Sequence, residues 1–134
     1  MSLRAIADTH TAIWYVFGDA RLSAVARAAI EDAALAGEHI GVSSSTFAEI
    51  IYLQECRRVD LSTLARLLFE LDRAGAVLIE VPFDRGVALA LQLVDRTQVP
   101  DMPDRIIAAT AVAARAPAIS RDGRIRLSSV PTIW

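Results

Sequence analysis

Short apolar runs of strand length alternate with longer amphipathic segments along the whole chain. Strands that alternate with helices need crossover connections, which produce a parallel sheet covered by helices on both faces. We therefore predict an α/β domain of three layers (αβα) with a central, mainly parallel sheet. The expected strands are residues 3–7, 39–42, 77–81, 116–120 and 130–134. The expected helices are residues 9–17, 23–35, 46–57, 62–74, 83–94 and 103–114.

Local signals support several of these boundaries. Ser23 is a suitable N-cap for the second helix, and Gly37 can end that helix in a left-handed conformation. The last strand should lie at an edge of the sheet, because Pro131 cannot donate a ladder hydrogen bond.

The size of the chain indicates one domain. Its 134 residues, 54% of them hydrophobic, suit a single globular unit with one core, so we expect residues 1–134 to form one domain. No apolar run approaches the roughly 18 residues that cross a bilayer, and the start leads into a strand-like run rather than a signal peptide. We expect no membrane association and a cytoplasmic location.

Missing residue types exclude several kinds of chemistry. The chain has no Lys, which excludes a P-loop lysine and Schiff-base catalysis. Cys56 is the only cysteine, so an internal disulfide and a cysteine zinc site are excluded, and its amphipathic surroundings predict a buried structural thiol. A net charge of −2 gives no general nucleic-acid footprint, so phosphate binding would be local and metal-assisted.

Two acids follow strand-like runs, and each also has an ordinary structural explanation. Asp8 ends the first run and can cap the helix that follows it. Asp122 precedes Gly123, and an Asp-Gly pair is a common turn signal.

Two further acids fall in the first turns of predicted helices. Glu49 comes three residues after Thr46, which is the spacing of a capping box. Asp104 follows Pro103 and complements the helix dipole, with Asp101 as the expected N-cap.

All four acids, Asp8, Glu49, Asp104 and Asp122, are expected at one rim of the sheet. Ligands of open parallel sheets bind beyond the carboxyl ends of the strands, which is where such acids would meet. Clustered carboxylates repel one another unless a cation neutralises them. Ligation by oxygen alone suits Mg²⁺ or Mn²⁺. The pattern therefore predicts a divalent-metal site.

These residues carry a family resemblance that spans essentially the whole chain. The matching segments are residues 6–10 followed by Ile13 and Trp14, Leu22-Ser23, Val42-Ser43 leading to Glu49, residues 101–109, and residues 119–122. Together they resemble PIN-domain ribonucleases, and more narrowly the VapC-type toxins of bacterial VapBC toxin–antitoxin pairs. Four acids in the right order make this signal more specific than any single segment.

The resemblance implies a site and a reaction. It assigns Asp8, Glu49, Asp104 and Asp122 to catalysis and metal binding, with Thr9, Ser120 and Asp101 as supporting neighbours. The implied activity is Mg²⁺-dependent hydrolysis of RNA phosphodiesters by an endoribonuclease toxin. Basic residues near the site are candidate phosphate contacts or solvated surface charges: Arg105, Arg121 and Arg124.

The resemblance also implies partners, namely a cognate antitoxin that neutralises the toxin and a second copy in a homodimer. The aromatic residues Trp14, Tyr15 and Phe17 fit either the core or a partner groove. His10 is more often structural in such a position, and a two-histidine mechanism with the distant His39 is not favoured.

Two alternative functions stay open at this point. One is a catalytically inactive PIN-like module that binds RNA or protein, against which the intact acid set argues. The other is an acidic phosphohydrolase of another α/β family. The chain lacks both an Asp-x-Asp after the first strand and a lysine, so this second alternative ranks last.

Overall fold

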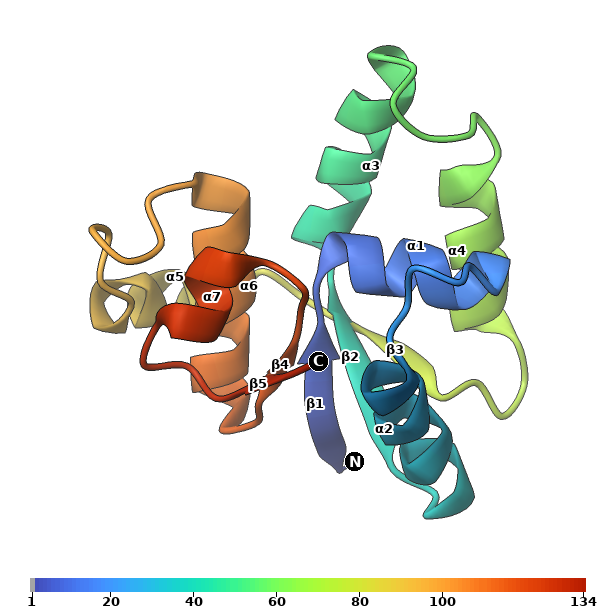
Figure 1. The fold of residues 1–134 in the computed structure, drawn as a ribbon, viewed down its shortest axis with the longest axis horizontal. Coiled ribbons are helices and arrows are strands. Elements are labelled where there is room, and N and C mark those ends of the chain that lie inside the picture. Colours follow the sequence, from blue (N-terminus) through green and yellow to red (C-terminus); the bar gives the residue numbers. More distant parts are fainter. Residues whose placement is uncertain (1) are drawn as a thin grey trace.

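The computed structural model describes residues 2–134 and contains a five-stranded sheet between two layers of helices (Figure 1). The strands lie in the spatial order β3-β2-β1-β4-β5, and every neighbouring pair is parallel. The predicted three-layer α/β fold is therefore confirmed, and β5 lies at an edge as expected. The strands are β1 (Leu3–Ala7), β2 (His39–Ser43), β3 (Leu78–Val81), β4 (Ala118–Ile119) and β5 (Thr132–Ile133).

The helices follow the predicted order, with one additional short helix at Gly123–Leu127. They are α1 (Thr9–Phe17), α2 (Ala24–Leu35), α3 (Ser45–Glu55), α4 (Thr63–Asp72), α5 (Arg85–Ala90), the 3₁₀ helix η1 (Leu91–Leu93), α6 (Met102–Ala114) and α7 (Gly123–Leu127). Ser23 caps α2 by accepting a hydrogen bond from the Ala26 amide, and Gly37 adopts a φ of 72° just beyond the end of α2. None of the helices in residues 2–134 is both long and apolar enough to span a membrane.

The pleat of the central strands divides the core between the two faces of the sheet. Ala5 and Ala7 of β1 belong to a cluster with buried residues of α1 and α2, whereas Ile6 belongs to a second cluster with residues of α5, α6 and α7. Successive side chains of a strand point to opposite faces, so a strand buried on both sides reads as an unbroken apolar run. The first strand was recognisable in the sequence for this reason.

Two expectations about individual residues were wrong. Cys56 is exposed, because it lies at the C-cap of α3, beyond the buried positions Ile50 and Leu53. Thr46 does not form a capping box with Glu49, because α3 begins one residue earlier, after Ser44, and Thr46 is fully buried instead.

The chain order creates a switch point beside β1. From β1 the chain proceeds to β2 and β3 on one side, and it later returns to β4 and β5 on the other. Crevices at such points, beyond the carboxyl ends of the strands, are the usual ligand sites of open parallel sheets. Asp8 follows β1 and Asp122 lies shortly after β4, so both acids lie at this edge.

Candidate metal centre

Asp8 is held rigidly at the carboxyl end of β1. One carboxylate oxygen, Oδ1, accepts a hydrogen bond from the Thr11 amide at 2.8 Å and thereby caps α1. The other, Oδ2, accepts the Ser120 hydroxyl proton at 2.5 Å, and the Asp8 side chain is buried. Asp8 is therefore a helix cap and a cavity-lining carboxylate at the same time.

Ser120 and Asp122 extend this arrangement from the end of β4. The Ser120 Oγ atom accepts a hydrogen bond from the Asp122 amide at 3.0 Å, so one buried hydroxyl connects both acids. Asp122 Oδ1 accepts the amides of Arg124 and Ile125 at 2.9 and 3.0 Å. The Asp-Gly pair, for which a turn was the favoured structural reading, instead starts the short helix α7.

Glu49 reaches the same edge from α3 on the opposite side of the cavity. Its Oε1 atom accepts the Thr9 hydroxyl proton at 2.7 Å, and the Thr9 and Thr46 hydroxyl oxygens lie 3.2 Å apart. Thr9 and Thr46 are both buried, so the contact that orients Glu49 is tertiary rather than a local cap.

Asp104 has the least hydrogen-bond support of the four predicted acids. It lies in the first turn of α6, and burial raises the pKa of its carboxyl from 3.8 to about 7, with further contributions from Asp122, Asp101, Glu49 and Asp8 in that order. All of these influences disfavour the charged form. Asp101 is the N-cap residue of α6, but its side chain caps no backbone amide, which leaves its carboxylate free at the rim.

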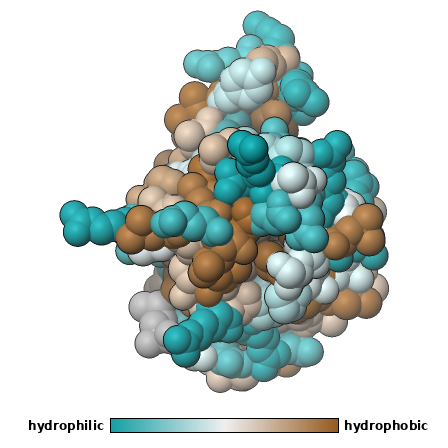
Figure 2. Space-filling view, turned by 90° about the vertical axis from the view of Figure 1, so that its left-hand side faces the viewer, coloured by the Kyte–Doolittle hydropathy of each residue, from teal (hydrophilic) through white to brown (hydrophobic). Residues whose placement is uncertain are grey.

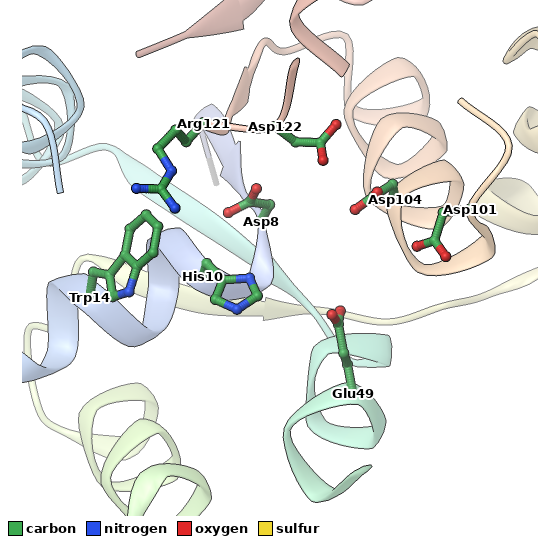
Figure 3. Close-up of a pocket in the computed structure, with 8 residues that line it drawn as sticks. All are labelled: Asp8, His10, Trp14, Glu49, Asp101, Asp104, Arg121 and Asp122. Atoms are coloured by element: carbon green, nitrogen blue, oxygen red, sulfur yellow. The ribbon is translucent and has the colours of Figure 1, made fainter. Parts of the chain in front are cut away.

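The acids surround one open cavity of about 400 Å³ (Figure 3). Asp8, Asp104 and Asp122 point toward a common space, and Glu49 faces them from α3. Within residues 2–134, the lining is Asp8, His10, Trp14, Glu49, Asp101, Asp104, Arg121 and Asp122. The structure thus brings together all four predicted acids, as well as Asp101.

The donor chemistry of this cavity fits a hydrated divalent cation. Within residues 2–134, no group of three or more acidic, histidine or cysteine side chains is arranged so that it could hold a metal ion by itself. Mg²⁺ usually keeps several waters and is held by one or two carboxylates, so it does not require a closed protein cage. After burial, the four neighbouring carboxylates also contribute to the raised pKa of Asp104, and a bound cation would offset that repulsion.

Not every predicted neighbour faces the cavity. The Arg105 guanidinium donates to the backbone carbonyls of Leu91 and Val94 at 2.8 and 3.2 Å, and neither Arg105 nor Arg124 lines the cavity. Arg121 does line it and lies over the Trp14 ring.

The two histidines have different positions. His10 is exposed and lines the acidic cavity, a location that its place beside a helix cap did not reveal. His39 begins β2 opposite Leu3, at the other end of the parallel strands, which rules out its cooperation with His10.

The fold and cavity define a single-sheet α/β protein with an acidic site at the carboxyl edge of its parallel strands. A family model described as the PIN domain matches residues 5–130, so the chain belongs to the PIN-domain family. None of the curated proteins compared with it matches the sequence significantly.

Solved structures share the fold at low sequence identity. The crystal structure of VapBC2 from Rickettsia felis bound to a DNA fragment from their promoter contains a chain with a TM-score of 0.69 and 16% identity, and the match covers 96% of each chain. A toxin–antitoxin complex from Klebsiella pneumoniae gives a TM-score of 0.52 and 21% identity over 88% of this chain and 86% of that chain.

Proposed function

We propose that this protein is a VapC-type toxin, a Mg²⁺-dependent endoribonuclease that hydrolyses RNA phosphodiesters. The observation that carries the proposal is the convergence of Asp8, Glu49, Asp104 and Asp122, from four separate parts of the chain, on one cavity. Membership in the PIN-domain family and the likeness to toxin–antitoxin structures support the same assignment.

Asp8, Glu49, Asp104 and Asp122 are the residues that would hold the hydrated ion, and the same site would accept Mn²⁺. When bound, a divalent ion lowers the pKa of a coordinated water and offsets the negative charge of the phosphate. Thr9 fixes the direction of the Glu49 carboxylate through its 2.7 Å hydrogen bond. Ser120 donates to the Asp8 carboxylate and accepts from the Asp122 amide. The hydroxyl groups of Thr9 and Ser120 therefore keep the acids in place.

The proposed protein partner is an antitoxin that neutralises the acidic cavity. A smaller cavity of about 190 Å³ adjoins it and shares His10 and Trp14 in its lining. Its apolar wall includes Ile13, Phe17 and Val59. An antitoxin segment with an apolar anchor for this wall and an Arg or Lys for the acids would fit both cavities. Trp14 itself is 4% exposed and belongs to the core, so it offers little open groove surface.

We also propose a homodimer. Leu89 of α5 and Leu93 of η1 are 57% and 70% exposed. Figure 2 shows hydrophobic surface gathered on the side of the molecule that carries these elements. Covering such surface is a common reason for self-association. Light scattering at micromolar concentration should therefore report a dimer, and a monomer would contradict this part of the proposal.

The nuclease proposal is tested with RNA and two carboxylate variants. The wild-type protein should cut total RNA in Mg²⁺ but not in EDTA, and Asp8→Asn and Asp104→Asn should abolish cleavage while remaining folded. Full cleavage by either variant would overturn the site assignment. Co-expression with the small reading frame beside the gene, followed by pull-down, tests the antitoxin. Harmless high-level expression of the toxin alone, together with no complex, would remove the toxin role.

A further inference from the structure

Among the described residues that line the acidic cavity, Arg121 is the one arginine or lysine, and it shares the cavity with five carboxylates. Within residues 2–134, ion pairs form between Arg4 and Glu38, Arg21 and Asp19, and Arg73 and Glu70. Arg121 forms none of these pairs. An arginine that served only to neutralise the acids would be expected to contact one of them, so its position calls for another explanation.

The contact that holds Arg121 is with an aromatic ring. Its guanidinium carbon lies 4.7 Å from the centroid of the Trp14 ring, and Figure 3 shows the guanidinium next to this ring at the side of the cavity. A guanidinium that lies over a ring is attracted by the π electrons and keeps its N–H edges available for other acceptors. Arg121 therefore keeps unused donors beside the carboxylates.

Trp14 is well suited to fix this position, because it is itself packed from several directions. The Trp134 ring centroid lies 5.8 Å away and the His10 ring centroid 5.6 Å away. The Arg21 guanidinium also lies over Trp14, at 5.3 Å, and Asp19 holds Arg21 in an ion pair. The ring under Arg121 is thus a buried support rather than a mobile surface group.

We propose that Arg121, supported by Trp14, forms a phosphate-binding subsite for the RNA strand beside the carboxylates. This inference rests on the proposed ribonuclease function and adds to it the group that attracts the substrate. Phosphodiesters are repelled by a cavity of acids, and a guanidinium can donate two parallel hydrogen bonds to phosphate oxygens. Arg121 would give the RNA strand a point of attachment within an otherwise repulsive cavity and would orient it toward the metal site.

The test separates phosphate contact from fold and from cleavage. Binding of a short fluorescein-labelled single-stranded RNA of mixed sequence is measured by anisotropy over a series of NaCl concentrations, in the Asp104→Asn background so that the RNA stays intact. The variants are Arg121→Ala, Arg121→Lys and, as a matched control, Arg126→Ala on α7, an exposed arginine that does not line the cavity. Circular dichroism confirms that each variant folds.

We expect Arg121→Ala to weaken RNA binding about tenfold and to reduce the slope of log affinity against log salt by about 0.7, the value for one lost phosphate contact on a single strand. Arg121→Lys should keep the slope but bind more weakly, because lysine lacks the planar fork. Arg126→Ala should change neither quantity. In otherwise wild-type protein, Arg121→Ala should raise the KM for RNA more than it lowers kcat.

The outcomes distinguish this inference from the proposed function. If Arg121→Ala binds RNA with the wild-type affinity and salt slope while Asp104→Asn abolishes cleavage, the subsite is wrong and the nuclease assignment stands. If the wild-type protein cuts no RNA but its binding still depends on Arg121, the subsite stands and the nuclease assignment is wrong. Equal losses for Arg121→Ala and Arg126→Ala would indicate a general charge effect and would overturn the subsite.

Discussion

Removal of the Asp104 charge should make the metal-free protein more stable, although the same change should abolish activity. The pKa of Asp104 is about 7 in the folded protein against a reference value of 3.8, a difference of about 3. At about 1.4 kcal/mol for each pKa unit this amounts to ~4 kcal/mol. Asp104 is only half-buried, so solvent screening reduces the cost to roughly 2 kcal/mol. Asp104→Asn also loses a favourable helix-dipole contact of about 0.5 kcal/mol, which leaves a net gain of ~1.5 kcal/mol.

The pH dependence of this gain has a definite sign. A carboxyl whose folded pKa lies above its unfolded pKa binds protons more tightly in the folded state, so the contribution of Asp104 to wild-type stability falls as pH rises from 3.8 through about 7. The stabilisation by Asp104→Asn should be complete above pH 7 and should vanish below about pH 4. At roughly 3 °C per kcal/mol, the variant should melt about 5 °C higher at alkaline pH in EDTA.

Thermal unfolding in EDTA and in Mg²⁺, repeated across this pH range, is the assay. Mg²⁺ should raise the melting temperature of the wild-type protein more than that of the variant. A ligand stabilises the folded state by binding to it, and the variant lacks one of the proposed Mg²⁺-binding carboxylates. The matched control is Asp32→Asn, the same substitution at an exposed position of α2, which should change stability by no more than about 0.5 kcal/mol. A variant that melts at or below the wild-type temperature at alkaline pH, or a gain that does not depend on pH, would refute the reasoning.

Three other substitutions, the third with a matched control, test separate parts of the structure. Glu49→Gln should abolish RNA cleavage with little change in melting temperature, because Glu49 caps no backbone amide; a large loss of stability would indicate a structural role. Ser120→Ala should lower the free energy of unfolding by about 1–3 kcal/mol in urea titrations, since it removes the hydroxyl that serves both Asp8 and the Asp122 amide, and an unchanged midpoint would argue against that link. Gly41→Ala should cost about 1–3 kcal/mol because its new Cβ would lie 2.7 Å from side-chain atoms of both Ile6 and Val81, whereas Gly123→Ala, which meets no atom within 4 Å, should not destabilise the fold.

The order of strands and helices could be predicted because each depends on a local pattern. The predicted bounds of α1 are those observed, since Asp8 caps its start and Gly18 adopts a φ of 63° at its end. Local patterns were less informative at the C-terminal end, where β4 pairs over only Ala118 and Ile119. The helix α7 was missed, because an Asp-Gly pair is equally typical of a turn and of an N-cap that starts a short helix.

The convergence of the four acids could also be predicted, but their individual environments could not. The spacing of Thr46 and Glu49 was interpreted as a capping box, whereas Thr9, distant in the chain, holds the Glu49 carboxylate. Arg105 and Arg121 are both arginines, and each is next in sequence to an acid of the site. Arg105 donates to the carbonyls of Leu91 in η1 and of Val94 just after it, whereas Arg121 lies over Trp14. Such choices depend on packing between distant segments, which no local pattern contains.

The local and functional explanations of the acids prove to be compatible. Asp8 accepts hydrogen bonds on both oxygens, Asp122 accepts two on one oxygen, and Glu49 accepts one from Thr9. Each of these bonds favours the charged carboxylate. Asp104 has no such support, and burial together with the neighbouring acids raises its pKa to about 7. Asp104, which lacks a local partner, therefore bears both the cost of burial and a part of the repulsion among the acids. Substitution at Asp104 should accordingly separate stability from activity more clearly than substitution at Asp8, where the fold and the site depend on the same oxygens.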